Sequence, residues 1–257
     1  MIAPKLRPHV ALFYAFARAI DDIADNPALS PEEKMARLDG FEQAITGRIH
    51  DIPGFEKAYR LRVSLIETGI SAQHCVDLVA AFKRDATKLR YWDWDDLMGY
   101  CNQSAAPVGR YLLDLHGESK EDYPASDALC NALQVINHLQ DCADDYRNLD
   151  RVYVPLDYLA AAGSSVEDLG RRQASPGLRR ALDRTLDGVE TLLPLAHRLP
   201  GRLKSRRLAM ESAVIAEIAT ALTALLRRRD PLAGRVQLGI PGFAWCAILG
   251  LWRAGLG

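Results

Sequence analysis

The sequence has too few cysteines, prolines and glycines for several common classes of protein. Its five cysteines are odd in number, widely spaced and free of any C-x-x-C pair. This excludes a zinc ribbon or a disulfide framework and suits a reducing compartment. Only 13 prolines and 18 glycines occur among 257 residues, which excludes a collagen-like or low-complexity chain. We therefore expect a protein that folds around a buried core without a disulfide or a structural metal.

Neither charge nor hydrophobicity is concentrated enough to indicate a nucleic-acid partner or a membrane span. The 32 Lys and Arg nearly cancel the 33 Asp and Glu, and a net charge of −1 argues against nucleic acid. Residues 1–9 lack a signal-peptide core. The most apolar stretch, 243–252, has about half the ~20 residues that a span needs. We expect a last helix docked on the core of a cytoplasmic protein. The alternative is a partly exposed element near a lipid entrance, with peripheral contact to the inner membrane.

Hydrophobic residues recur at three- and four-residue spacing along nearly the whole chain, which predicts amphipathic helices. Asn26-Pro27 ends the first helix, and Ser30 with Glu33 forms a capping-box pattern that starts the second. That helix should reach Gly47. Further helices are expected over 54–68, 71–88, 94–117, 125–148, 176–199, 203–229 and 241–253. The strand-like run 152–154 is closed by a proline, so we expect an extended loop there. No linker divides the chain, and we predict one all-α domain over residues 1–257.

An acidic cluster, residues 21–25, lies just before the end of the first helix. Asp21 and Asp25 are four residues apart and share one face, with Arg18 a turn earlier. Negative charge at a helix C-terminus opposes the helix dipole at a cost of about 0.3–1 kcal/mol per group, so a cation should compensate it. By itself the cluster fits a ligand site and a solvated helix end equally well.

A second polar stripe lies on the expected helix 125–148. Its members share one helical face and are Gln134, Asn137, Asp141, Asp144 and Asp145. Most neighbouring positions are apolar, which is typical of a buried helix. The stripe should therefore face an interior cavity, where carboxylates must be paired or bind a metal. His138 points about 100° away from Asn137 on a helix, so neither a zinc site nor a di-iron site is indicated.

Together the two acidic stripes supply only hard oxygen donors. In proteins Mg²⁺ is commonly held by one or two carboxylates together with substrate phosphates and water. Two facing carboxylate helices therefore predict a clamp that binds a diphosphate through Mg²⁺.

A run of small residues follows Tyr100 and surrounds Pro107. Small side chains let another helix or a bulky ligand come close, and the proline should kink the helix and free the carbonyl of Gln103. Close helix packing and a ligand cavity both remain open at this point. Cys101 as a nucleophile is a weaker alternative, because nothing in the sequence marks a base partner.

Taken together, these motifs resemble those of the squalene/phytoene synthase family. The matching runs are 14–25, 100–109 and 133–145, followed by Arg151-Val-Tyr-Val-Pro155. They keep the family's order and spacing over roughly residues 5–165. The resemblance implies the all-α isoprenoid synthase fold, a helical bundle around a central cavity.

The resemblance also implies roles for individual residues. Mg²⁺ on the substrate diphosphate would be held by Asp21, Asp25, Asp141 and Asp145. The substrate-binding set would be Arg18, Asp22, Asp144 and Arg151. The reaction cavity would be lined by Tyr100, Gln134 and Asn137. The substrate would be a prenyl diphosphate, either presqualene or farnesyl diphosphate, with Mg²⁺ as the cofactor.

Within the family, details resemble the hydroxysqualene synthase branch of bacterial hopanoid synthesis. These are Pro107, Gln140 where phytoene and presqualene diphosphate synthases usually carry Arg, and the run 83–91. The branch ionises presqualene diphosphate and ends the reaction with one water, without NADPH. The rival reaction joins two farnesyl diphosphates to presqualene diphosphate or squalene. A rival of another class is a non-catalytic scaffold, which the intact acidic motifs disfavour.

The sequence departs from the family pattern at three places. Asp144 replaces the commoner Glu, and Asp150 replaces the usual glycine. The family's upstream segment is also missing before Arg7. Because that segment helps to close the diphosphate pocket, we expect a misplaced start, a shortened chain or reduced activity.

Overall fold

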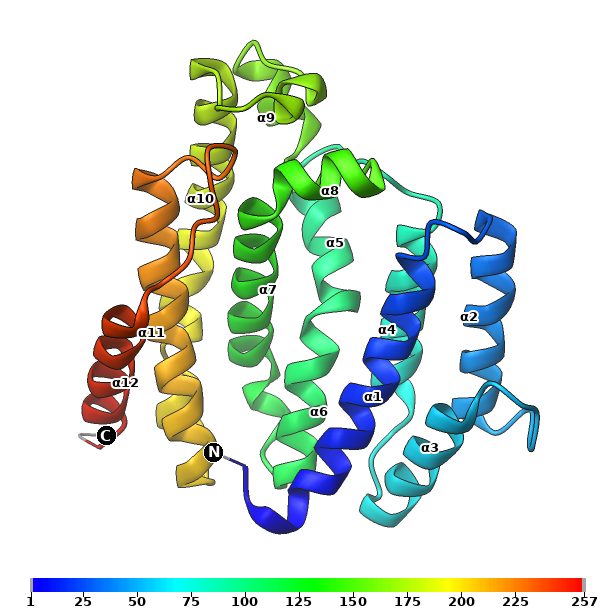
Figure 1. The fold of residues 1–257 in the computed structure, drawn as a ribbon. Helices are drawn as coiled ribbons and strands as arrows, with labels where there is room; N and C mark the ends of the chain where they lie inside the picture. The colour runs from blue at the N-terminus through cyan, green and yellow to red at the C-terminus, as the bar shows by residue number, and fades with distance from the viewer. Residues whose placement is uncertain (1, 256–257) are drawn as a thin grey trace.

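The computed structural model describes residues 2–255, which fold into helices with no strand among them (Figure 1). The helices are α1 (Arg7–Ala24), α2 (Pro31–Thr46), α3 (Glu56–Thr68), α4 (Gln73–Asp85), α5 (Trp94–Ser104), α6 (Ala106–His116), α7 (Tyr123–Gln140), α8 (Cys142–Leu149), α9 (Leu156–Ala161), α10 (Pro176–Ala196), α11 (Arg206–Arg228) and α12 (Ile240–Gly255). Short 3₁₀ turns are η1 (Pro4–Leu6), η2 (Lys120–Asp122), η3 (Val166–Gly170) and η4 (Pro200–Arg202). The predicted all-α class is confirmed.

Local sequence signals set several helix ends as expected. At the start of α2, the Ser30 hydroxyl accepts from the Glu33 N–H at 3.2 Å, and the Glu33 carboxylate accepts from the Ser30 N–H at 2.8 Å. This is the predicted capping box, which satisfies two free N–H groups of the first turn. The helix ends at Gly47, whose φ of 77° lies in the left-handed region that glycine adopts readily. Residues 152–154 form the expected extended loop, and Val152 makes an isolated bridge to Arg90.

Two expected helices are broken, and the prediction of continuous helices there was wrong. The segment 94–117 divides at Ala105 into α5 and α6, because Pro107 has no N–H to bond the carbonyl of Gln103. The segment 125–148 divides at Asp141, whose φ of −103° and ψ of 6° are not helical. Asp141 still bonds the carbonyl of Asn137 at 2.9 Å, and α8 restarts one residue later. The second polar stripe therefore changes direction at Asp141, one of its predicted metal ligands.

The buried side chains form two hydrophobic clusters. One lies among α5, α7, α10 and α11, and the other lies among α1 to α4 with Tyr111 and Leu115 of α6. In the second cluster Phe13 stacks on Tyr111, with ring centroids 4.0 Å apart. Burying each such side chain contributes roughly 1.5–3 kcal/mol to stability. The bundle is therefore held by two packed groups of helices, and α6 contributes to the cluster around α1.

The small-residue run serves close helix packing at Gly109. A Cβ atom built on Gly109 of α6 would lie 2.3 Å from the Ser126 hydroxyl oxygen and 2.6 Å from the Cys130 sulfur of α7. No side chain fits at that distance, so glycine lets the backbone of α6 approach α7. This supports the packing interpretation that the sequence left open. It also fixes α7 against the rest of the bundle.

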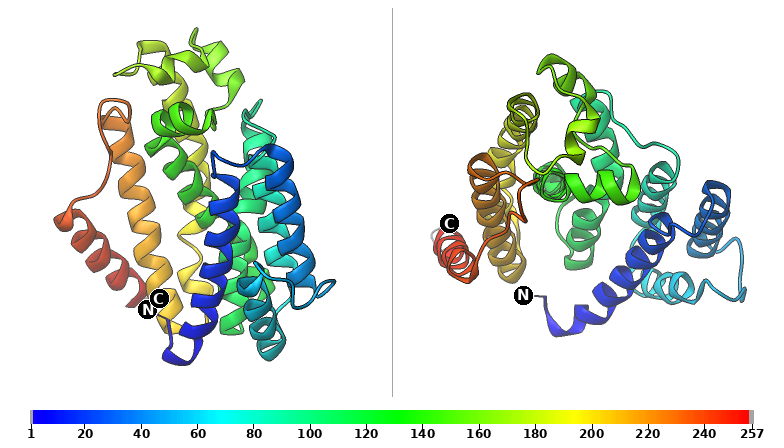
Figure 2. Two further views of the ribbon diagram at one scale, coloured as in Figure 1. Left: turned by 45° about the vertical axis from the view of Figure 1, so that its right-hand side comes forward. Right: turned by 45° about the horizontal axis from the view of Figure 1, so that its top comes forward.

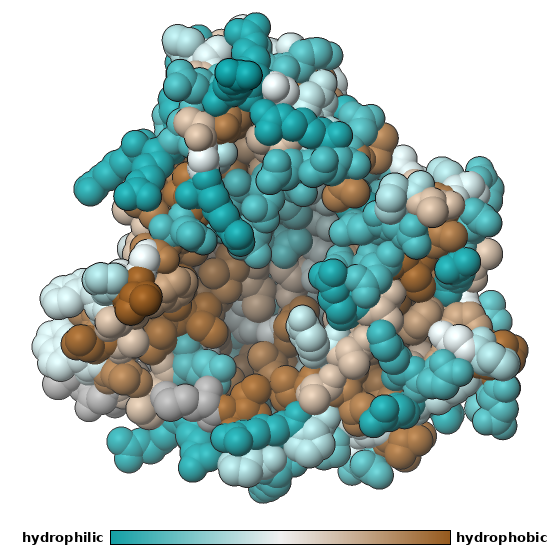
Figure 3. All heavy atoms as spheres, viewed as in Figure 1, coloured by the Kyte–Doolittle hydropathy of each residue, from teal (hydrophilic) through white to brown (hydrophobic). Residues whose placement is uncertain are grey.

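A hollow opens between the two groups of helices. Helix α1 packs on α2, α3 and α4, whereas α7 packs mainly on α10, α6 and α11. The views in Figure 2 separate α1 from α11 in the same way. Figure 3 shows this face hollowed at its centre, with hydrophobic residues on the floor and the α11 side and hydrophilic residues along the upper rim. The predicted central cavity is therefore an apolar hollow open on this face.

Helix α11 is long and apolar enough to cross a bilayer by length and composition alone. It packs against α12, α10 and α7, and 44% of its most apolar window is buried. The core helix of a globular protein can have the same length and composition, so these two properties of α11 are weak evidence for a membrane segment. In this bundle α11 forms one side of the hollow (Figures 1 and 3).

Candidate active site

The two acidic motifs lie at the same end of the bundle and are joined by Arg151. Arg151 is buried, and its guanidinium donates to the Asp25 carboxylate at 2.6 Å and to the Ala24 carbonyl at 3.0 Å. Its backbone N–H donates to the carbonyl of Asp145 at 3.1 Å. One residue thus ties the C-terminus of α1 to α8. The cation that the acidic helix end required is present, which confirms that prediction.

Arg18 supplies a second cation on the first motif. Its guanidinium lies 3.0 Å from an oxygen of Asp21 and 2.9 Å from an oxygen of Asp22. The Arg18 side chain is 58% exposed, so these pairs contribute only about 0–1 kcal/mol to stability. The structure places Arg18 beside the predicted metal ligands, and its exposure leaves it accessible to a bound anion.

Burial and repulsion between carboxylates raise the pKa values of three predicted metal ligands, Asp21, Asp141 and Asp145. Burial raises the pKa of Asp21 to about 6, with Asp25 adding repulsion and Arg18 opposing it. Burial also raises the pKa of Asp145 to about 7, with repulsion from Asp141 and Asp25 and attraction to Arg151. Arg151 contacts both Asp25 and the Asp145 carbonyl, so the two motifs lie within reach of one residue. Such crowded carboxylates favour a bound cation.

The donor chemistry of these residues fits Mg²⁺. All four predicted ligands are carboxylates, the hard oxygen donors that Mg²⁺ takes together with water and phosphate oxygens. Within residues 2–255, no three His, Cys, Asp or Glu side chains are gathered closely enough to hold a metal ion by themselves. Substrate oxygens and water would therefore have to complete the coordination.

A separate pocket of about 300 Å³, distinct in its polar lining from the apolar hollow, lies beside the second motif. Its polar lining consists of Gln140, Asp141, Asp144, Arg147 and Arg235. Arg235 lowers the pKa of Asp141, although burial raises it overall. Two arginines here could contact a diphosphate. Sequence reasoning missed both: Arg147 could have been found from its position one turn after Asp144, whereas no local pattern marks Arg235.

A buried network connects Arg151 with two of the predicted cavity-lining residues, Tyr100 and Gln134. Asp85 accepts hydrogen bonds from the hydroxyls of Tyr100 at 2.7 Å and Tyr153 at 3.2 Å. Burial raises the pKa of Asp85 to about 6, while Arg151 and the two hydroxyls oppose the rise. The Tyr100 hydroxyl donates its proton to Asp85, so it does not donate to a water. Asp85 lies in the run 83–91 and received no role from the sequence, because its partners come from distant segments.

His138 belongs to the same network, on a different helical row from Asn137. Its ring stacks on Tyr153 with centroids 3.5 Å apart, and Nε2 accepts from the Gln134 amide at 3.1 Å. Burial lowers the pKa of His138 to about 3, so the ring is neutral. Its Nδ1 faces Asp145 at 4.0 Å. Sequence reasoning set His138 aside, yet it connects the predicted cavity residue Gln134 to the predicted metal ligand Asp145.

The remaining predicted residues differ in accessibility. Asn137 is exposed, and no described residue forms a hydrogen bond with its side chain, whereas Gln134 is half-buried and bonded to His138. Asp144 is 75% exposed, with Arg147 3.9 Å away. Burial raises the pKa of the Cys101 thiol well above its ordinary value, so a thiolate nucleophile is disfavoured. The structure thus brings Tyr100 and Gln134 into one network and leaves Asn137 free for a ligand.

An all-α bundle with two carboxylate motifs at the rim of an apolar hollow is the architecture of an isoprenoid synthase. The squalene/phytoene synthase family model matches residues 1–241. The chain is 45% identical to hydroxysqualene synthase of Rhodopseudomonas palustris over 238 residues, 93% of this chain and 80% of that relative. Identity to the Zymomonas mobilis hydroxysqualene synthase is 43%, over 92% and 80% of the two chains.

Solved structures agree with this family. The crystal structure of a squalene synthase from Alicyclobacillus acidocaldarius superposes with a TM-score of 0.76 at 33% identity, covering 88% of this chain and 85% of that one. A dehydrosqualene synthase in complex with a ligand gives a TM-score of 0.79 at 19% identity, which shows a common fold. The chain therefore belongs to the squalene/phytoene synthase family and has the all-α isoprenoid synthase fold. Both predictions from the sequence motifs are confirmed.

Proposed function

We propose that this protein is a Mg²⁺-dependent hydroxysqualene synthase. It converts presqualene diphosphate and water into hydroxysqualene and diphosphate, within hopanoid or squalene biosynthesis. The observation that carries the proposal is the pair of acidic motifs joined by Arg151 at the rim of an apolar hollow. Identity of 43–45% to hydroxysqualene synthases supports this branch of the family over the others.

The acidic end of the bundle binds and ionises the diphosphate. Asp21, Asp25, Asp141 and Asp145 would hold Mg²⁺, which when bound supplies positive charge to the leaving group. Arg18 donates hydrogen bonds to diphosphate oxygens from the exposed side of α1. The bond between the cyclopropylcarbinyl carbon and the diphosphate oxygen breaks, and the electron pair leaves with the diphosphate. Fixed positive charge at this position stabilises the developing negative charge.

The apolar hollow shelters the carbocation until one water captures it. Apolar walls exclude bulk water and so prevent early capture. The free amide of Asn137 and the Gln134 amide can hold a single water by donating and accepting hydrogen bonds. The neutral ring of Tyr100, held in place by Asp85, stabilises the cation through its face. The water oxygen forms the new C–O bond, and its proton leaves with the released diphosphate.

Product identification tests this proposal. Purified protein is given presqualene diphosphate, or farnesyl diphosphate, with and without NADPH, and in Mg²⁺ or EDTA. We expect hydroxysqualene and diphosphate in equal amounts from presqualene diphosphate, independent of NADPH and lost in EDTA. Squalene formed only with NADPH, or product formed only from farnesyl diphosphate, would assign the rival reaction. No diphosphate release from either substrate would indicate a non-catalytic scaffold.

The role of the amides has a separate test. Asn137→Leu should lower the fraction of hydroxysqualene and raise the fraction of olefins, because the cation then loses its positioned water. Gln173→Leu, on an exposed loop, is the control and should leave the products unchanged. If Asn137→Leu makes hydroxysqualene in the wild-type proportion, the amide does not position the water.

A further inference from the structure

Helix α12 carries an exposed apolar face that no described residue covers. Its inner side is closely docked on α11: Cys246 is buried, and a Cβ atom on Gly250 would lie 2.7 Å from the backbone of Val214. Its outer side exposes large hydrophobic residues, which are Ile240, Phe243, Trp245, Ile248, Leu251 and Trp252. The two tryptophans are 65% and 62% exposed. A patch of this kind on one helix marks an interaction surface rather than scattered surface residues.

The chemistry of this face suits the boundary between lipid headgroups and acyl chains. Helix α12 contains no carboxylate in its sequence, and its two exposed tryptophans combine an apolar ring with one N–H donor. Tryptophan is enriched at the bilayer–water boundary for this reason. The helix has 16 residues, too few to span a bilayer, and one side is already occupied by α11. It can therefore lie along a bilayer surface but not cross it.

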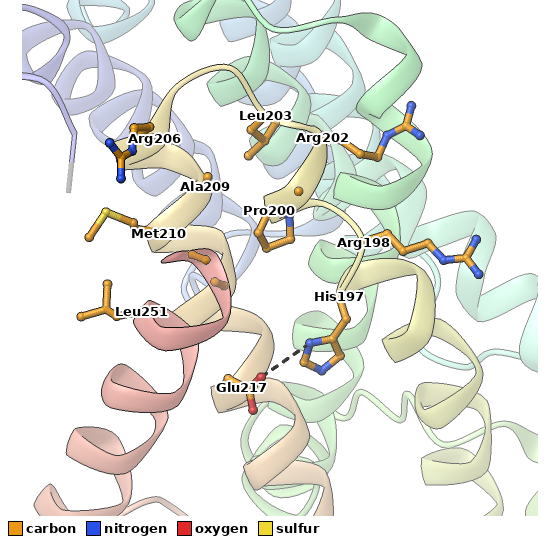
Figure 4. A pocket seen from close by; sticks show the side chains of 13 residues that line it. His197, Arg198, Pro200, Arg202, Leu203, Arg206, Ala209, Met210, Glu217 and Leu251 are labelled. Atoms are coloured by element: carbon orange, nitrogen blue, oxygen red, sulfur yellow. Dashed lines mark ion pairs between the residues drawn. The ribbon is translucent and has the colours of Figure 1, made fainter. Parts of the chain in front are cut away.

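Basic residues gather next to the C-terminal end of α12. A groove of about 870 Å³ lies between this end and the turn that joins α10 to α11 (Figure 4). Arg198, Arg202 and Arg206 line it together with apolar Leu203, Met210 and Leu251. Arg202 pairs with Asp122 at 2.7 Å, whereas Arg198 and Arg206 are exposed and form no ion pair with any described residue.

The same turn adds two more exposed cations, and the Glu118 carboxylate beside them accepts from the backbone N–H groups of Lys204 and Ser205, each at 2.8 Å. Lys204 and Arg207 are exposed. Glu217 lines the groove, and its carboxylate lies 3.7 Å from the ring of His197 (Figure 4). We call this segment, residues 198–207, the basic turn. Its surplus of positive charge complements anionic lipid headgroups.

The basic turn and the acidic site lie at opposite ends of the bundle. Helix α1 carries its acidic motif at the upper end in Figure 1, where α8 also lies, whereas η4 and the start of α11 lie at the lower end. An anionic surface would therefore attract one end of the molecule and repel the other. The basic turn lies at the same end as the C-terminus of α12, so the attraction to an anionic surface acts next to the apolar face of α12 and away from the acidic site.

We propose that α12 and the basic turn form a docking surface for an anionic phospholipid bilayer. The outer face of α12 inserts its tryptophans at the level of the headgroups, and Arg198 and Arg206 bind lipid phosphates. The proposal does not rest on the reaction assigned above, because it uses no residue of the acidic site.

Vesicle flotation with the purified full chain tests the proposal. The vesicles are phosphatidylcholine alone, or phosphatidylcholine mixed with phosphatidylglycerol. We expect binding to the mixed vesicles, with a blue shift of tryptophan fluorescence and partial release by high salt. Trp245→Ser together with Trp252→Ser should weaken binding at least about ten-fold. Trp92→Ser removes a tryptophan that is 67% exposed in the loop before α5, away from the docking surface, and should change nothing.

The charged half of the surface has its own variants, which are exposed and so should not affect folding. Arg198→Gln and Arg206→Gln should each weaken binding about five-fold on mixed vesicles and leave phosphatidylcholine binding unchanged. Absence of binding to both kinds of vesicle overturns the proposal. Binding of the tryptophan and arginine variants as tight as that of the wild-type protein overturns it as well. A concentration-dependent dimer in sedimentation that the tryptophan variant abolishes would instead make this face a contact between two copies of the chain.

Discussion

Replacing Asp145 by Asn should stabilise the protein in the absence of metal. Burial and repulsion from Asp141 raise the pKa of Asp145 from 3.8 to about 7 in the folded protein. A carboxyl group with a raised pKa favours the folded state only while it is protonated. Its contribution is therefore fully present below about pH 4 and is lost as the pH rises toward 7. The Asn side chain has nearly the same shape as Asp but does not ionise, so the variant does not lose this stability as the pH rises.

The magnitude follows from the two pKa values. The rise from 3.8 to about 7 gives an upper limit of about 4 kcal/mol, at about 1.4 kcal/mol for each pH unit. The Asp145 side chain is 21% exposed, and screening by solvent should reduce the effect to about 2 kcal/mol at pH 8. At pH 5 the increase in the free energy of unfolding caused by Asp145→Asn should be below about 1 kcal/mol. For a chain of this size, about 2 kcal/mol corresponds to a rise in Tm of roughly 4–8 °C.

Thermal and urea denaturation in EDTA, at pH 5 and pH 8, measure this effect. The control is Asp144→Asn, whose carboxylate is 75% exposed and which should change stability by less than about 0.5 kcal/mol. Added Mg²⁺ should stabilise the wild-type protein more than Asp145→Asn. The reasoning is refuted if Asp145→Asn lowers the Tm at pH 8, or if it raises the Tm equally at both pH values.

Further variants test packing, the buried network and the diphosphate contact. Gly109→Ala should cost about 1–3 kcal/mol in thermal denaturation because its Cβ has no space, whereas Gly99→Ala, with nothing within 4 Å, should be neutral or stabilising. Tyr100→Phe should cost about 1.5–3 kcal/mol by removing a hydrogen bond to a buried carboxylate. Tyr91→Phe should cost nothing, since the Tyr91 hydroxyl is buried without a described partner; equal costs would contradict the assigned network. Arg18→Lys should lower kcat/KM for diphosphate release at least about ten-fold with stability unchanged, because it loses the planar fork that matches phosphate. Wild-type kcat/KM would make Arg18 a purely structural ion-pair partner.

The sequence was sufficient to predict what depends on local periodicity and motif spacing. Helical patterning gave the all-α class, the capping box at Ser30, and the extended loop 152–154. The acidic cluster on α1 required a nearby cation, and Arg151 provides it. These features follow from helix geometry and the helix dipole, which act within a few residues of chain.

The unpredicted features depend on contacts between distant segments. Asp141 interrupts a helix that its flanking sequence favours, so the corner at the second motif was missed. Asp85 gains its position from tyrosines 15 and 68 residues away, and Arg151 meets Asp25 across 126 residues. His138 was set aside on helical angle alone, although its role follows from stacking on Tyr153. None of these pairings leaves a local pattern in the sequence.

The origin of the alcohol oxygen tests the central claim most directly. Purified protein with Mg²⁺ converts presqualene diphosphate in ¹⁸O-labelled water without NADPH, and the product is analysed by mass spectrometry. Ionisation followed by capture of water predicts hydroxysqualene that carries one ¹⁸O atom, with unlabelled oxygen at the bridging position retained by the diphosphate. Unlabelled alcohol would mean cleavage of the P–O bond instead, and it would contradict the proposal that the acidic motifs ionise the substrate at carbon.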